Sequence, residues 1–167
     1  MRTKKNSDFE IGEIVVYPKH GVGEITGIES MEISSIKTKF YLVKMEQGKL
    51  TIHVPLDKQD EVGLRKICSK KVINEVFEIL KLKPKIRRIM WSRRAQEYET
   101  KIYSGDPIKI SEVVRDLYRK SSQAEQSYSE RQMFQVAIER LAREVAAVEK
   151  TDYFQSTEKI EQILNKK

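Results

Sequence analysis

The sequence contains little of what enzymes use for chemistry. Its 167 residues include one cysteine, Cys68, and two histidines, His20 and His53. A single cysteine excludes a disulfide within the chain. The chain shows no metal-ligand spacing, nucleophile elbow, phosphate-binding loop or dinucleotide fingerprint. We therefore expect no catalytic residues, no metal site and no cofactor.

Long apolar runs are missing as well. No stretch approaches the roughly 20 apolar residues that are needed to cross a bilayer. The basic residues 1–5 are not followed by an apolar stretch, so we expect neither a membrane contact nor a signal peptide. Together with the single cysteine, these absences favour the reducing cytoplasm as the location of the protein.

The net charge of +7 is unevenly spread along the chain. Residues 1–60 carry 9 Lys/Arg and 9 Asp/Glu, residues 61–100 carry 11 and 5, and residues 101–167 carry 12 and 11. Nearly all of the positive excess therefore lies in the middle stretch. A local excess of this kind indicates a contact with a polyanion, whereas the neutral N-terminal part suits a protein partner better.

The N-terminal part has the alternating pattern of β-strands. We expect strands at residues 13–17, 22–28, 39–46 and 49–54, with a tight two-residue turn at Gln47-Gly48. Pro55 ends the last of them. A small barrel that is partly open leaves one strand edge unpaired, and a strand from another protein can complete it. The sequence does not tell which strand forms that edge.

From about Ser69 the apolar period changes to that of helices. Pro84 ends the first expected helix, the second runs from Trp91 to Tyr103, and the third begins at Asp106-Pro107. We expect a fourth helix from about Ser129, whose spacing to Gln132 resembles a capping box, and a last short helix opened by Ser156 or Thr157.

These patterns predict an α+β chain of two domains. Residues 1–62 are expected to form a small Tudor-like or SH3-like β-barrel. Residues 63–167 are expected to form a compact, all-α domain of about five helices.

A basic run precedes and enters the second expected helix. Seven of the fourteen residues from Lys81 to Arg94 are basic, and no acidic residue occurs from Ile79 to Gln96. A solvated helix face normally mixes charges of both signs. Lysine and arginine neutralise phosphates and release counterions. The run therefore predicts contact with a nucleic-acid backbone, through Lys85, Arg87, Arg88, Arg93 and Arg94.

Trp91 is the only tryptophan, and it lies inside this basic run. A tryptophan is commonly a core residue, because it buries a large area. The polar neighbours Ser92, Arg93 and Arg94 argue against that interpretation. Three uses stay open on the residues alone: stacking on an unpaired base, wedging into the minor groove, or packing on a partner protein.

Two blocks of the sequence resemble the CarD/CdnL family of bacterial transcription regulators. The resemblance extends over about residues 9–150, and the occurrence of two independent blocks in one order argues against chance similarity. The blocks consist of Ile11–Gly21, Tyr41–Val43 and Leu50–Pro55 in the N-terminal part, and of Trp91–Arg94, Ser104–Asp106 and Glu112–Leu117 in the C-terminal part.

The resemblance implies a monomeric, nucleoid-associated factor with two partners. It implies that an edge strand of the N-terminal domain adds to a sheet of the RNA polymerase β subunit, and that Trp91 wedges into the minor groove at the upstream edge of the transcription bubble. His53 and Met31 stand where family members often carry basic residues, so we expect a weaker charge contact with polymerase. The expected polymerase-binding residues are Leu50, Thr51, Ile52, His53, Val54 and Met31.

Two other functions compete with this interpretation. The chain could act as a stand-alone binder of RNA or of single strands, with Trp91 stacking on a base, or as an adaptor that binds only proteins. An enzyme is the least favoured class, because no catalytic constellation is present. The sequence leaves open whether a given promoter is activated or repressed.

Overall fold

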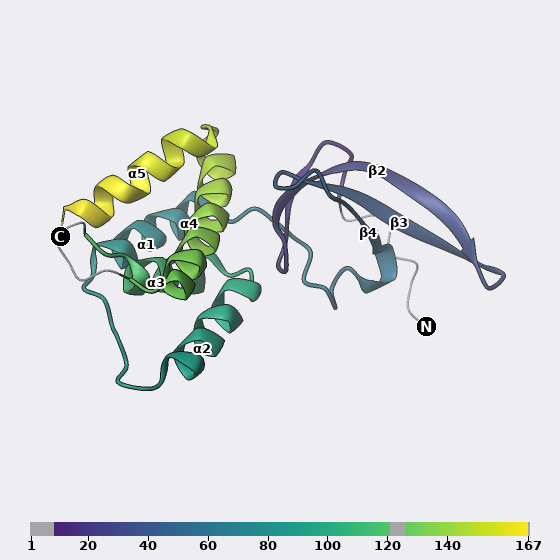
Figure 1. Cartoon of the computed structure of the whole chain (residues 1–167). Helices are drawn as coiled ribbons and strands as arrows, with labels where there is room; N and C mark the ends of the chain where they lie inside the picture. Colours follow the sequence, from purple (N-terminus) through teal and green to yellow (C-terminus); the bar gives the residue numbers. More distant parts are fainter. Residues whose placement is uncertain (1–8, 121–125, 167) are drawn as a thin grey trace. The chain divides into compact units, whose positions relative to one another are not determined.

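The structure is a computed structural model that describes residues 9–120 and 126–166 (Figure 1). The chain divides into two compact units, Met1–Ile67 and Cys68–Lys167. The first unit is an antiparallel sheet and the second is a domain of five helices. The predicted two-domain α+β class is therefore confirmed.

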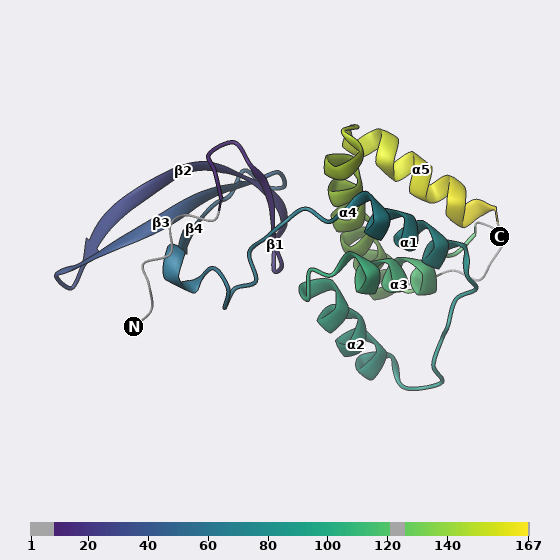
Figure 2. The same cartoon turned by 180° about the vertical axis from the view of Figure 1, so that it is seen from behind.

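The first unit is a five-stranded sheet in the order β4-β3-β2-β1-β5. Figures 1 and 2 show β2 and β3 as a long, twisted ribbon that runs beyond the shorter strands. One face of the sheet is closed by a core that includes Val15, Ile25, Tyr41, Val43 and Val54. The strands are β1 (Ile14–Tyr17), β2 (Gly21–Ile33), β3 (Ile36–Met45), β4 (Thr51–Pro55) and β5 (Arg65–Lys66).

The turns of the two long hairpins differ from each other. β2 and β3 are joined by Ser34 and Ser35 alone, with φ angles of 51° and 66°. These positive angles are those of a type I′ turn, which glycine or asparagine usually supplies. Between β3 and β4, the N–H of Met45 donates to the carbonyl of Leu50 over 2.8 Å. That loop has four residues, 46–49, so the predicted two-residue turn is wrong.

Gly23 lies where β2 approaches β3 most closely. A Cβ atom built on it would lie 2.9 Å from Cγ1 of Val43 and 3.0 Å from the carbonyl oxygen of Lys44. The register between the two strands shifts next to it, between Ile25 and Gly27. A bulge strengthens the local twist, and the missing side chain at Gly23 lets the strands pack closely as they bend.

The second unit has α3 (Pro107–Leu117) at its centre. In Figures 1 and 2, α3 lies among α1, α2 and α4, and contacts with each of these helices agree with that position. Every helix contributes to one core, which contains Val76, Ile102, Val114, Leu141 and Ile160. The other helices are α1 (Lys70–Lys81), α2 (Trp91–Tyr103), α4 (Tyr128–Glu149) and α5 (Tyr153–Asn165). None of the described helices is long and apolar enough to cross a membrane.

The last two helices begin earlier than the sequence indicated. Ser127, not Ser129, caps α4, and its hydroxyl accepts a hydrogen bond from the N–H of Glu130. Asp152 and Gln155 form the capping box of α5. Ser156 is buried inside that helix, so the predicted starts at Ser156 or Thr157 are wrong. Asp152 caps α5 in preference to Ser156 because its carboxylate also interacts favourably with the positive end of the helix dipole.

Candidate functional site

The basic loop of residues 82–90 is exposed, but α3 holds it in place. Oδ1 of Asp116 accepts a hydrogen bond of 2.9 Å from the backbone N–H of Lys85. The same oxygen accepts one of 2.8 Å from Nε of Arg115. The Arg115 and Asp116 side chains are almost completely buried. A paired, buried carboxylate therefore anchors the loop that carries most of the basic run.

Trp91 is the first residue of α2 and is half-buried. It packs against the core of the helical unit, and its ring centroid is 6.3 Å from that of Tyr98. The guanidinium of Arg94 lies 5.4 Å from the Trp91 ring and 5.7 Å from the Tyr98 ring. Packing therefore fixes one portion of the Trp91 ring while another portion stays in solvent, and a contact of Trp91 with nucleic acid stays a prediction.

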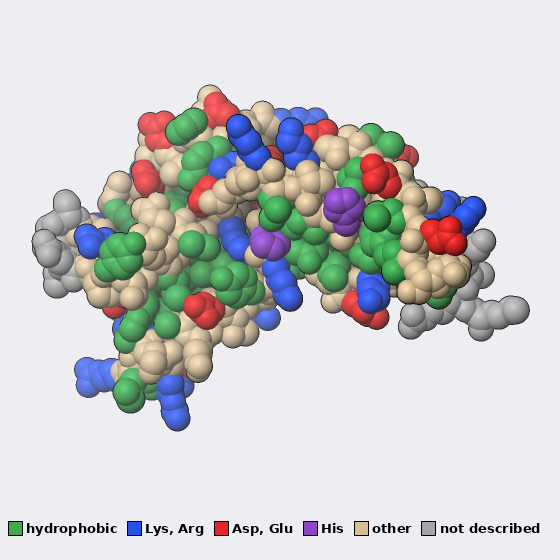
Figure 3. Space-filling view, turned by 45° about the vertical axis from the view of Figure 1, so that its right-hand side comes forward, with side chains coloured by type: hydrophobic (Ala, Val, Ile, Leu, Met, Phe, Trp, Pro, Cys, Tyr) green, Lys and Arg blue, Asp and Glu red, His purple; other side chains and the backbone are tan. Residues whose placement is uncertain are grey.

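The predicted DNA-binding residues fall into two groups. Arg88 and Arg93 are exposed, and no carboxylate partner is recorded for them in the described part of the chain. Lys85, Arg87 and Arg94 line one pocket. Figure 3 shows Lys and Arg side chains projecting from the lowest part of the helical unit, where the loop before α2 lies. Their use in binding DNA stays a prediction.

Sequence reasoning missed two basic residues of the same pocket. Lys101 and Arg115 lie outside the basic run, and each pairs with a carboxylate, that of Glu112 and that of Asp116. Their positions could not be read from the basic run, because the packing of α2 on α3 brings them there.

Trp91 also lines an apolar groove of about 380 Å³ between α2 and α4. Ile102 and Met133 lie along it, and the exposed rings of Tyr103 and Tyr128 border it. Apart from Glu99, no charged side chain lines this groove. No group of three or more His, Cys, Asp or Glu residues that could hold a metal ion occurs in residues 9–120 and 126–166.

β4 forms one end of the sheet, and within the described ranges no strand pairs with its outer edge. The side chains of Thr51 and His53 are exposed, as is that of Leu50 just before the strand. Val54 is buried and Ile52 is half-buried against the core. A partner that docks along this edge would meet the backbone of the predicted contact residues Thr51 to Val54, but not the side chain of Val54.

An exposed apolar row extends from this edge strand along the β2–β3 ribbon. Met31, Ile33 and Ile36 are 47%, 51% and 67% exposed. The strand register places them on the same face as His53, whose ring lies 6.4 Å from that of Phe40. Figure 3 shows apolar side chains in the open on this unit. Met31 was expected as a contact; Ile33 and Ile36 were missed, although their alternation with polar residues signals one common face.

Each of the two units matches a known protein family. Residues 75–164 match the family model described as CarD, C-terminal domain, and residues 9–68 match the model described as CarD-like/TRCF RID domain. The chain is 29% identical over 140 residues to the Bacillus subtilis protein named "Putative transcription factor YdeB", covering 84% of this chain and 92% of that protein.

Two further relatives match only the sheet unit. A transcription-repair-coupling factor of Bacillus subtilis is 41% identical over 61 residues, which are 36% of this chain and 5% of that protein. A solved structure titled CdnLNt, from Myxococcus xanthus, is 36% identical and covers 40% of this chain and 94% of its own, with a TM-score of 0.33.

Proposed function

The chain belongs to the CarD family of transcription factors, which are not enzymes, and carries the RNA polymerase-interacting domain shared with transcription-repair-coupling factors; on this premise we propose that it binds the polymerase β subunit and promoter DNA. The edge of β4 would contact polymerase, and the surface around Trp91 would contact DNA. The two contacts together would stabilise the open promoter complex. The chain would do so as a monomer in the cytoplasm, at the nucleoid.

The open edge of β4 supports the polymerase contact. A strand added there makes main-chain hydrogen bonds that need no particular side chains. The apolar row of Met31, Ile33 and Ile36 would then bury against the partner. Since Met31, Ile33 and Ile36 carry no charge, this contact relies on apolar burial more than on charge.

The position of the Trp91 ring is the observation that best supports the DNA contact. Its ring is held from behind by Tyr98 and the helical core, so it can be pushed between bases without collapsing onto the protein. The exposed Arg88 and Arg93 lie next to it in the sequence and can neutralise phosphates. A wedge costs a few kcal/mol of unstacking, least where the duplex is already distorted. We therefore expect preference for a melting junction, with little sequence specificity.

The mechanism is a shift of the promoter equilibrium. A ligand that binds the open complex better than the closed complex stabilises it by the difference in affinity. Binding to polymerase makes the DNA contact effectively intramolecular, so a weak DNA-binding surface suffices. Activation or repression then depends on the promoter, because a very stable open complex can also slow escape.

The test is the lifetime of the open complex formed by the cognate polymerase. We expect the wild-type chain to lengthen it and Trp91→Ala to lose most of that effect. Phe154→Ala is the matched control, because Phe154 is an aromatic residue on α5 that is 79% exposed and lies outside the basic run. An unchanged lifetime with the wild-type chain would refute the proposal, and preferential binding to free single strands would favour a stand-alone nucleic-acid binder.

A further inference from the structure

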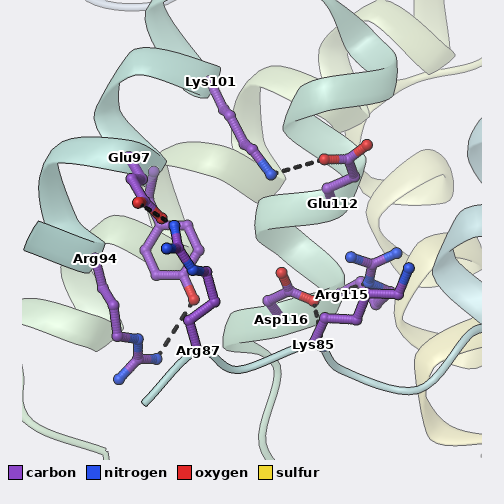
Figure 4. A pocket seen from close by; sticks show the side chains of 9 residues that line it. Lys85, Arg87, Arg94, Glu97, Lys101, Glu112, Arg115 and Asp116 are labelled. Carbon is purple, nitrogen blue, oxygen red and sulfur yellow. Dashed lines mark hydrogen bonds and ion pairs between the residues drawn. The ribbon is translucent and has the colours of Figure 1, made fainter. Parts of the chain in front are cut away.

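We propose that the pocket between α2 and α3 binds a phosphate group, and that Arg94 couples its occupancy to the position of Trp91. Figure 4 shows the side chains from the basic loop, α2 and α3 that line this pocket, whose volume is about 300 Å³. The inference goes beyond the proposed function, because it requires neither polymerase nor a promoter. The cations that line the pocket are Lys85, Arg87, Arg94, Lys101 and Arg115.

The charges of the pocket do not cancel. Five cations face three carboxylates, which leaves a formal charge of +2. Each carboxylate is already paired with one of the cations: Glu97 with Arg87, Glu112 with Lys101, and Asp116 with Arg115. For Lys85 and Arg94, no carboxylate partner is recorded in the described ranges. The pairs fix the walls of the pocket, and the two remaining cations are available to an anion.

Arg94 has unused hydrogen-bonding capacity at this place. Its Nε atom is buried and has no hydrogen-bond partner in the described part of the chain. Its Nη2 donates to the Tyr98 hydroxyl over 3.4 Å, which is longer than is usual for such bonds. A buried donor without a partner is unfavourable. A phosphate offers several acceptor oxygens, and the planar guanidinium matches their geometry.

The size of the pocket suits a compact ligand group. A volume of about 300 Å³ is at the lower end for small-molecule sites. The paired carboxylates in its walls disfavour apolar ligands. One phosphate group, or two linked ones, provides the charge needed within that space. The group could belong to a free phosphorylated metabolite or to the backbone of a bound nucleic acid, and the experiment separates these two sources.

Arg94 connects the pocket to Trp91. Its guanidinium lies within 6 Å of both the Trp91 and the Tyr98 ring centroids, the range of a cation–π contact. An anion that draws the guanidinium into the pocket changes this contact. The rotation and exposure of the Trp91 ring therefore respond to the anion. Because Trp91 is the only tryptophan, its fluorescence reports on the pocket directly.

The first experiment titrates the full chain with inorganic pyrophosphate and follows binding by calorimetry and by Trp91 fluorescence. Sodium chloride at matched ionic strength serves as the reference. We expect saturable binding of one pyrophosphate with a fluorescence change that chloride does not reproduce. Lys85→Gln and Arg94→Gln should each weaken binding about tenfold, and Arg94→Gln should abolish the fluorescence change. Lys109→Gln, at an exposed position of α3 outside the pocket, should bind like the wild type.

Absence of saturable binding would overturn the proposal, as would an equal loss of affinity in Lys109→Gln. Lys85→Gln keeps the test valid if Arg94→Gln unfolds, because the Lys85 side chain is exposed. A second titration adds a short DNA duplex with and without saturating pyrophosphate. Competition assigns the site to a backbone phosphate, and independent binding assigns it to a free phosphorylated ligand. Neither titration contains polymerase, so failure here is distinct from failure of the open-complex assay.

Discussion

The carboxylate of Asp116 accepts a hydrogen bond from the backbone N–H of Lys85, which joins the C-terminal end of α3 to a loop 31 residues earlier in the chain. The same carboxylate pairs with Arg115. One buried acid on α3 therefore holds the basic loop, and through it the start of α2, where Trp91 lies.

Replacing Asp116 should lower the stability of the fold more than replacing any exposed acidic residue. Asp116→Ala leaves Arg115 as an uncompensated buried charge and frees the N–H of Lys85, so we expect a loss of about 3–5 kcal/mol. The measurement is urea unfolding, followed by circular dichroism. Asp57→Ala, at an exposed position of the sheet unit, should change stability by less than about 0.5 kcal/mol. A loss below about 1 kcal/mol for Asp116→Ala would contradict the anchoring role.

Gly23 and Gly27 lie four residues apart in β2 and should respond differently to the same change. Gly23→Ala forces Cβ against Val43 and a backbone oxygen, so we expect a loss of about 1–3 kcal/mol. At Gly27 the nearest atom to a built Cβ is on the flexible Leu42 side chain at 3.4 Å, an ordinary contact. Gly27→Ala should therefore be nearly neutral. Equal midpoints of thermal unfolding for the two variants would disprove the close-approach argument.

The polymerase contact should depend on the apolar row of the β2–β3 ribbon. Ile36→Asp places a charge where burial is expected, and we predict at least a tenfold loss of affinity for the polymerase β subunit, measured by surface plasmon resonance. Affinity of the wild-type chain should change little between low and moderate salt, because the apolar row adds no charge to this contact. Ile11→Asp is the control, since Ile11 is 65% exposed but lies outside the row. Similar losses in both variants would argue against this surface.

DNA binding by the isolated chain should be weak, insensitive to sequence and steeply dependent on salt. Arg88→Gln and Arg93→Gln should each lower the slope of log affinity against log salt by about one, because each removes one phosphate contact. Fluorescence anisotropy with two unrelated duplexes measures both properties. The matched control is Lys71→Gln, an exposed lysine of α1 before the acid-free run. A tight consensus site that resists salt would be inconsistent with binding through the backbone.

The sequence predicted most of the helical unit because its signals are local. Asp106-Pro107 marks the start of α3 through a side-chain cap and a proline that lacks an N–H. Pairs of possible caps were harder to rank. Ser127 and Ser129 each have a suitable residue three positions later, and only tertiary packing of α4 decides that Ser127 is the cap.

Long-range features of the site were beyond the sequence. The Ser34-Ser35 turn has none of the residues that normally announce a type I′ hairpin, so the length of β2 was underestimated. The basic run predicted Lys85, Arg87 and Arg94 as binding residues. Lys101 and Arg115 lie in the same pocket only because α2 packs on α3. A linear pattern cannot contain that contact. The residues expected to bind polymerase and DNA remain predictions until the experiments above are done.

The edge of β4 also has a consequence for the free protein. An edge strand that can accept a strand from polymerase can accept one from a second copy of the chain, which is the first step of aggregation. β4 limits this risk by its length of five residues and by ending at Pro55, which cannot donate a hydrogen bond to a growing ladder. A short edge that ends at proline therefore stays open to a partner strand while it restricts pairing between copies of the free protein.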